Sequence, residues 1–312
     1  MIDNSVHLIT GGSGFIGSNI INYLLKKNNK IICIDNFSTG NIQNLKPFNE
    51  DRRLTIINHD VAKPFDYKCD YIWHFACPAS PLAYKKDPIK TMKTCFNGTL
   101  NVLNIVKKYN SKLLFTSSSE IYGSSDSIPL REDNYGLVDL NSDRACYVEG
   151  KRIAETLCYE YLKGYLLDIK VVRIFNAYGP RMSINDKRVI NSFLENGINN
   201  QNLIIYGDGN QTRSFCYIDD LLIILEKIME SNFSGPFNVG SDFEMSILDL
   251  AKLIKARFYP NISIEFEMPR MHEPKRRKPS LELVKKMFDW QPRILLEEGL
   301  DKTYEYLIYT KN

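Results

Sequence analysis

A tyrosine and a lysine stand four residues apart in a segment that reads as a helix. In CYVEGKRIAE (146–155), Tyr147 and Lys151 therefore share one helical face. A free tyrosine has a pKa of about 10 and is a poor base at neutral pH. A neighbouring ammonium favours the phenolate and lowers this pKa. The pair indicates an activated tyrosine base, although the same spacing also occurs by chance in many helices.

Three serines and an acid lie about thirty residues before this pair. TSSSEIYG (116–123) places Ser118 and Ser119 at the end of a predicted buried strand, directly before Glu120. A hydroxyl at this position could orient a substrate for proton transfer to Tyr147. Glu120 has two interpretations: it acts on the substrate, directly or through water, or it bonds to a nearby basic side chain as a fixed support.

A glycine-rich stretch follows the first predicted strand and opens a helix. TGGSGFIGSNI (10–20) contains Gly11, Gly14 and Gly17, and it also fits G-x-G-x-x-G from Gly12. Such glycines allow a tight turn and bring the backbone close to a pyrophosphate at the helix N-terminus. Asp35 ends the second strand, where a carboxylate accepts the ribose hydroxyls of a dinucleotide. A carboxylate repels a 2′-phosphate, so the sequence predicts NAD and not NADP as cofactor.

A second acid stands at the end of the third predicted strand. In HDV (59–61), Asp60 and Val61 are placed to contact the adenine ring. An ordinary helix cap is an alternative interpretation of Asp60. The sequence alone leaves both open.

These residues all lie in an alternation of apolar strands and amphipathic helices. Strands are predicted at 6–10, 31–35, 54–58, 71–75, 112–117 and 169–175, and helices at 15–27, 88–108 and 147–163. The alternation predicts a Rossmann-type, doubly wound parallel α/β sheet. We expect residues 1–178 to form an NAD-binding domain, with a return at about 215–240. Residues 179–312 are expected to form mainly a smaller substrate-binding lobe.

The composition of the 312 residues excludes several classes of protein. A net charge of +3, with one dense basic run at 275–278, does not indicate a nucleic-acid binder. Seven scattered cysteines without CxxC spacing, and dispersed histidines, argue for reduced thiols and against a metal site. The sequence has no run of apolar residues long enough for a membrane span and no visible N-terminal signal. A cytoplasmic protein is therefore expected.

With these motifs in order, the chain resembles the extended short-chain dehydrogenase/reductase family of nucleotide-sugar epimerases, dehydratases and decarboxylases. The resemblance implies that Ser118 or Ser119, Tyr147 and Lys151 form the oxidising set. It implies that Tyr147 takes a proton from a sugar hydroxyl while hydride passes to NAD. A non-catalytic NAD-binding homologue is the alternative, but such proteins often lack the tyrosine or the lysine.

Several longer stretches resemble the UDP-glucuronate decarboxylases within this family: 77–84, 87–94, 143–156, 173–190, 206–221 and 275–292. The resemblance implies a UDP-sugar substrate and a catalytic set that includes Glu120 and Arg277. It implies cofactor contacts from Gly11, Gly14, Phe15, Ile16, Gly17, Asp35, Asn36, Asp60, Val61, Ala76, Thr94, Tyr147 and Lys151. It implies substrate contacts from Pro78, Ser80, Tyr84, Lys93, Asn176, Arg181, Tyr206, Arg213 and Arg277.

The resemblance also bears on the reaction type. The decarboxylases usually carry Thr where this chain has Ser118, and Asp where it has Ser280. Dehydratases typically read Asp-Glu where this chain reads Ser119-Glu120, and 4-epimerases typically have a small or apolar residue in place of Glu120. Decarboxylation is thus favoured, with 4-epimerisation or 4,6-dehydration as alternatives. Beside a substrate carboxylate, Glu120 could hold a proton. The resemblance further implies a homodimer through the helices at 88–108 and 147–163.

Overall fold

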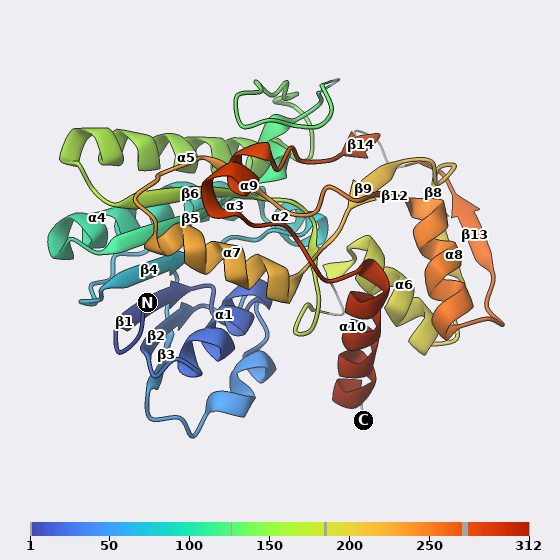
Figure 1. Ribbon diagram of the computed structural model, residues 1–312, viewed down its shortest axis with the longest axis horizontal. Helices are drawn as coiled ribbons and strands as arrows, with labels where there is room; N and C mark the ends of the chain where they lie inside the picture. The colour runs from blue at the N-terminus through green and yellow to red at the C-terminus, as the bar shows by residue number, and fades with distance from the viewer. Residues whose placement is uncertain (1, 126, 184–185, 270–273, 312) are drawn as a thin grey trace.

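Seven parallel strands form the central sheet of the molecule (Figure 1). The computed structural model describes residues 2–125, 127–183, 186–269 and 274–311. The strands stand in the order β11-β6-β5-β4-β1-β2-β3, and all neighbours are parallel. The predicted doubly wound sheet is confirmed. Its strands are β1 (Val6–Thr10), β2 (Lys30–Asp35), β3 (Leu54–Asn58), β4 (Tyr71–His74), β5 (Lys112–Ser118), β6 (Ile169–Ile174) and β11 (Phe237–Val239).

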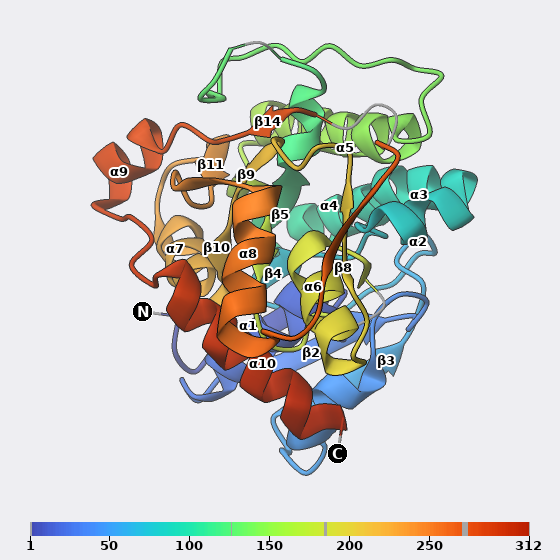
Figure 2. The same ribbon diagram turned by 90° about the vertical axis from the view of Figure 1, so that its right-hand side faces the viewer.

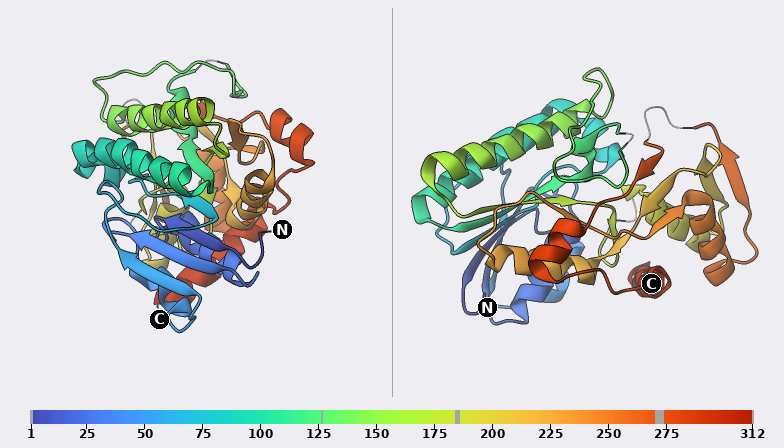
Figure 3. Two further views of the ribbon diagram at one scale, coloured as in Figure 1. Left: turned by 90° about the vertical axis from the view of Figure 1, so that its left-hand side faces the viewer. Right: turned by 45° about the horizontal axis from the view of Figure 1, so that its top comes forward.

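Helices cover both faces of this sheet. Helices α4 (Thr99–Tyr109) and α5 (Ala145–Tyr165) lie on one face, and α1 (Phe15–Leu25) and α7 (Ile218–Glu230) lie on the other (Figures 1 and 3). The strand order reverses between β1 and β4. In sheets of this kind, ligands bind beyond the carboxyl ends of the strands at the point of reversal.

The strand sequences explain this layering. Strands buried on both faces need apolar residues at nearly every position, and successive side chains point to opposite faces. The core on the α4 and α5 side contains Leu8, Ile34, Ile72, Leu113 and Val171. The core on the α1 and α7 side contains their neighbours in sequence, Ile9, Cys33, Trp73, Leu114 and Val172.

A smaller lobe follows β6 and packs beside the carboxyl end of the sheet. Figure 2 shows its helices α6 (Val189–Ile198), α8 (Ile247–Phe258) and α10 (Leu296–Lys311). Its strands form three small sheets, and its core is continuous with the core beneath α1 and α7. The other elements after β6 are β7 (Ala177–Tyr178), β8 (Leu203–Tyr206), β9 (Thr212–Ser214), β10 (Cys216–Tyr217), β12 (Glu244–Ser246), β13 (Ile264–Glu267), β14 (Arg276–Arg277) and α9 (Glu282–Phe288).

The segment predicted as one helix over 88–108 is divided in the structure. It consists of α3 (Pro88–Lys93), the π-helical turn η2 (Thr94–Gly98) and α4, preceded by α2 (Pro81–Lys86). A π turn shifts the helical phase, so the residues before and after it present different faces. Two 3₁₀ helices, η1 (Ile42–Phe48) and η3 (Ser119–Tyr122), follow β2 and β5. None of the described helices is long and apolar enough to cross a membrane.

Candidate active site

The loop from β1 to α1 brings two segments of backbone into contact. Gly11 has a φ of +71°, and a Cβ there would lie 2.8 Å from the backbone nitrogen of Ala76. A Cβ at Gly17 would lie 2.2 Å from the Gly11 carbonyl oxygen, so both positions require glycine. Gly14 is the N-cap of α1, and within the described chain no side chain caps this helix end. Its free N–H groups suit an anion such as a pyrophosphate.

Asp35 lies beside this loop and is buried. Its carboxylate accepts hydrogen bonds from the backbone nitrogens of Ser13 (2.9 Å) and Phe37 (2.8 Å). Each carboxylate oxygen has a further lone pair for a ribose hydroxyl. The buried hydroxyl of Ser13 has no hydrogen-bond partner among the described residues. An acid, an unpaired hydroxyl and an uncapped helix N-terminus together fit a dinucleotide.

The acid after β3 is already engaged by the protein. Asp60 Oδ1 accepts the N–H of Ala62 at 3.0 Å, and its other oxygen lies 3.9 Å from Lys90 Nζ. The sequence left open that Asp60 caps a helix. In the structure Asp60 accepts a backbone N–H as a cap does, but the N–H belongs to a turn. Val61 is buried, and a Cβ at Gly98 would lie 2.9 Å from it.

Ser118 and Tyr147 meet at the end of β5. The Ser118 side chain lowers the pKa of Tyr147, and the ring of Tyr84 stacks on that of Tyr147 with centroids 5.1 Å apart and planes 9° apart. Ser118 Oγ also accepts the N–H of Glu120 at 3.2 Å. Ser118 and Tyr84, which lie 29 and 63 residues before Tyr147 in sequence, thus both act on its phenol ring; the stacking of Tyr84 was not predicted from the sequence.

The protein chain by itself does not lower the pKa of Tyr147. Burial raises this pKa well above its ordinary value, and the Ser118 side chain only partly opposes the shift. Lys151 is buried and donates to the carbonyl of Thr116 at 2.7 Å. The lowering expected from the sequence stays a prediction for the site with NAD bound, where the positive nicotinamide ring adds to the Lys151 ammonium.

Glu120 is held by two arginines. Its Oε2 forms an ion pair with Arg144 and lies 3.7 Å from Arg277. Arg277 is 3% exposed and also donates to the carbonyls of Ser119 (3.0 Å) and Gly123 (3.1 Å). Burial by itself would raise the pKa of Glu120, but Arg277 and Arg144 outweigh it and lower that pKa. The two guanidinium groups therefore favour the ionised carboxylate in the protein chain by itself, and the proton expected on Glu120 beside a substrate carboxylate stays a prediction.

A third arginine joins this group from the smaller lobe. In the parallel pair of β14 and β9, Arg277 is the register partner of Arg213. Arg213 lowers the pKa of Glu120 less than Arg277 and Arg144 do. Asn176, which follows β6, has a buried side-chain nitrogen without a partner among the described residues. Arg213 and Arg277 form a cationic wall that suits phosphate oxygens, and the Asn176 amide is a further donor with no partner among the described residues.

Arg181 is not part of this wall. Its guanidinium bonds to the carbonyl of Ser18 (3.2 Å) and the side chain of Asn19 (3.3 Å) in α1, and it lies over the ring of Phe48. The predicted substrate contact at Arg181 thus falls on a residue that joins the smaller lobe to the first helix.

The other predicted residues lie in the following places. Ser80 caps α2, Thr94 bonds to the Lys90 carbonyl, and Lys93 is exposed on α3. Phe15, Ile16, Asn36, Ala76, Pro78 and Tyr206 are half-buried. Residues 184 and 185, within the matching stretch 173–190, lie outside the described residues.

Sequence reasoning missed two members of the site. Arg144 lies 24 residues after Glu120, at the start of α5, and nothing in its spacing reveals an ion pair across that distance. Ser13 stands inside the glycine loop, where only its lack of a bonding partner marks it. The ion pair of Arg144 and the Ser13 hydroxyl, unpaired among the described residues, are visible only in the folded structure.

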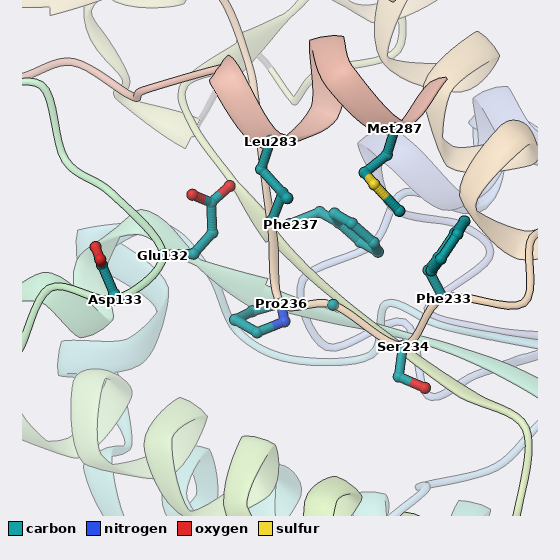
Figure 4. Close-up of a pocket in the computed structure, with 9 residues that line it drawn as sticks. Glu132, Asp133, Phe233, Ser234, Pro236, Phe237, Leu283 and Met287 are labelled. Atoms are coloured by element: carbon teal, nitrogen blue, oxygen red, sulfur yellow. The ribbon is translucent and has the colours of Figure 1, made fainter. Parts of the chain in front are cut away.

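A pocket also lies away from this site (Figure 4). It is lined by Glu132, Asp133, residues 233–237, Leu283 and Met287, and its lining is mostly apolar. The Glu132 carboxylate accepts the N–H of Asn238 at 2.9 Å, so it is bonded to β11, the strand at the edge of the central sheet. None of the predicted catalytic, cofactor or substrate residues lines this pocket.

Comparison with known proteins agrees with this geometry. UDP-glucuronic acid decarboxylase 1 of Arabidopsis thaliana is 42% identical over 295 residues, covering 95% of this chain and 68% of that protein. The protein of the same name from Danio rerio is 42% identical, covering 96% and 72%. UDP-glucuronic acid 4-epimerase from Bacillus cereus, solved with UDP-glucuronic acid and NAD, superimposes with a TM-score of 0.88 at 25% identity, covering 98% and 99%.

The family assignment rests on the part of the chain that carries the glycine loop, the serines and the Tyr-Lys pair. Residues 7–240 match the NAD dependent epimerase/dehydratase family, and they include six strands of the sheet from β1 to β6 as well as β11. The chain belongs to the NAD dependent epimerase/dehydratase family.

Proposed function

We propose that this chain is an NAD-dependent UDP-glucuronate decarboxylase that forms UDP-xylose and CO₂. The observation that carries the proposal is the position of the Glu120 carboxylate, which pairs with Arg144 and Arg277 two residues after Ser118, whose side chain acts on Tyr147. Relatives at 40–42% identity over most of the chain bear the name UDP-glucuronic acid decarboxylase. A glutamate without a preceding aspartate suits a reaction that expels no hydroxide.

The proposed chemistry begins at C4 of the sugar. Ser118 orients the C4 hydroxyl and Tyr147 accepts its proton. Bound NAD supplies the hydride acceptor at C4 and later the hydride that reduces C4 again. A C4 carbonyl stands β to the carboxylate, so CO₂ can leave while the carbonyl takes up the electron pair. C5 is then protonated, and Glu120 would position a water for that step.

The cofactor proposal rests on the other side of the site. Asp35 and the N-terminus of α1 would hold the adenosine ribose and the pyrophosphate. Lys151, fixed by the Thr116 carbonyl, would hold the nicotinamide ribose. Arg213, Arg277 and Asn176 would hold the UDP diphosphate, with Tyr206 near the uracil.

One incubation tests the reaction. The purified protein is mixed with UDP-glucuronate and NAD, and CO₂ and UDP-sugars are measured. CO₂ together with UDP-xylose is the expected result. UDP-galacturonate without CO₂ would instead identify a 4-epimerase, and NAD binding without turnover of the sugar would identify a binding homologue.

We also propose the division of labour within the chain and its assembly. Residues 1–178, with the return at about 215–240, would hold NAD, and residues 179–312 would mainly hold the UDP-sugar. The return contains α7, and β11 (Phe237–Val239) pairs with β6. A homodimer is supported by four apolar side chains that are 37% to 68% exposed on neighbouring helices: Ile89, Met92, Phe96 and Ile153. Seven free thiols support a reducing compartment, the cytoplasm.

A further inference from the structure

Two cysteine sulfurs meet beside the candidate active site. The Sγ atoms of Cys77, which follows β4, and Cys95, in the π turn η2, lie 3.2 Å apart. Cys95 is 3% exposed, whereas Cys77 is half-buried. No catalytic step proposed above uses either thiol. Their contact joins the β4 loop to the helical layer of α3, α4 and α5.

The two thiols are not equivalent. The hydrogen bond with Cys95 lowers the pKa of Cys77, burial opposes this, and the Lys151 ammonium lowers it further. The same contact with Cys77, together with burial, raises the pKa of Cys95. Because Cys77 is also the more exposed residue of the two, Cys77 is the attacking sulfur and Cys95 the resolving one.

We propose that Cys77 and Cys95 form a dithiol modification site that a peroxide converts to a disulfide. The Cys77 thiolate attacks one peroxide oxygen, so an S–O bond forms, the O–O bond breaks, and the departing hydroxide takes up a proton to become water. The Cys95 sulfur then attacks Cys77: an S–S bond forms, the S–O bond breaks, and the hydroxyl leaves with the thiol proton as a second water. Two thiols lose two electrons and two protons, and one peroxide becomes two waters.

The location of the pair determines what its oxidation does. Cys77 adjoins Ala76, whose backbone packs on Gly11 of the glycine loop. Cys95 packs on Gly150, where a Cβ would lie 3.0 Å from its sulfur, and Gly150 directly precedes Lys151. A disulfide has an S–S length of about 2.0 Å, so the sulfurs must approach by about 1 Å. This movement pulls the glycine-loop side of the site toward α5.

Misplacement on this scale slows a reaction that needs aligned groups. A shift of about 1 Å can cost on the order of a hundredfold in rate. The disulfide is therefore expected to inactivate the enzyme reversibly. This consequence rests on the proposed decarboxylase activity, whereas formation of the disulfide does not.

The test treats the purified protein with hydrogen peroxide and follows two readouts. Mass spectrometry should show the loss of two hydrogen atoms and a linked peptide containing Cys77 and Cys95. Release of CO₂ from UDP-glucuronate should fall by about a hundredfold and recover with dithiothreitol. Cys95→Ser should keep its activity before treatment, form no linked peptide and resist short exposure to peroxide.

Cys146→Ser is the matched control, because Cys146 is a further partly buried thiol close to Cys77. This variant should still form the disulfide between Cys77 and Cys95. A disulfide between Cys77 and Cys146, or equal inactivation of the Cys95→Ser variant, would overturn the proposal. A protein that forms the linked peptide but never releases CO₂ would contradict only the proposed function.

Discussion

The guanidinium of Arg277 lies 3.7 Å from the carboxylate of Glu120, although 157 residues separate them in sequence. Arg277 comes from the smaller lobe, and Glu120 follows β5 of the central sheet. The ion pair therefore connects the lobe proposed to hold the sugar nucleotide with the strand that carries Ser118. The residues proposed to bind the substrate and those proposed to transfer its proton are thus linked by this ion pair.

Replacing Glu120 by glutamine tests its part in the reaction. Glu120→Gln keeps the shape of the side chain but removes the charge beside Arg144 and Arg277. We expect CO₂ release to slow by about a hundredfold, the lower range for loss of a proton-transfer group. Glu160→Gln, an exposed glutamate in α5, is the control. An unchanged rate in Glu120→Gln would leave Glu120 as a structural support only.

Arg213 in β9 and Arg276 in the neighbouring strand β14 allow a matched test of substrate binding. Arg276 is exposed and pairs with Glu244, whereas Arg277 is buried beside Arg213. Arg213→Ala removes a cation from the wall proposed to hold the diphosphate, so KM for UDP-glucuronate should rise by about 10-fold to 100-fold. Arg276→Ala should leave KM unchanged. Equal effects of the two substitutions would argue against a phosphate site at Arg213.

The proposed dimer can be broken at its apolar face. Ile153 in α5 and Met92 in α3 are exposed apolar residues on neighbouring helices. Ile153→Glu places a charge in that face, so light scattering after gel filtration should show a monomer in place of a dimer. Phe266→Glu, at an exposed position of β13, should leave the dimer intact. A wild-type protein that is already monomeric would refute the assembly.

Two buried histidines make the fold sensitive to acid. Burial lowers the pKa of His7 from 6.5 to about 4, and burial with Lys151 lowers that of His74 to about 3. Between pH 6.5 and these values, the unfolded chain binds protons that the folded chain does not. Each histidine should therefore lower the free energy of unfolding by about 1.4 kcal/mol for every pH unit below 6.5.

Urea unfolding at several pH values between 7 and 5 measures this slope. His7→Asn removes one of the two titrating groups, so its stability should depend less steeply on pH than that of the wild type. His7 also accepts the Trp73 indole N–H at 3.0 Å, so the variant loses some stability at every pH. The slope, and not the absolute stability, is the readout. An identical slope in His7→Asn and wild type would contradict the prediction.

Sequence patterns predicted most strands of the central sheet and the strand ends at which the candidate site residues lie. Asp35 and Ser118 lie at the ends of β2 and β5. Both positions could be predicted, because a run of apolar residues indicates a buried strand and the first polar residues after the run indicate its end. The pairing of Arg213 with Arg277 was not predictable as a contact, because it depends on the register of two short strands 64 residues apart. Local periodicity carries no information about such a pairing.

The same limit applies to the pKa of Tyr147 in the protein chain by itself. The spacing to Lys151 is a local feature, but the loss of hydration comes from distant segments, including Tyr84 stacked on the ring. Likewise, the helical periodicity over 88–108 continued through η2, where a π turn interrupts the α-helical hydrogen bonding. Burial and backbone register are properties of the assembled molecule.

The position of β11 also affects how the chain is made. Phe237–Val239 covers the edge of β6, yet the ribosome synthesises it more than sixty residues after β6 ends. During that interval β6 keeps an open edge able to pair with other nascent chains. The outer strand of the nucleotide-binding sheet thus closes late in synthesis, and chaperone binding to translating ribosomes should concentrate in this window.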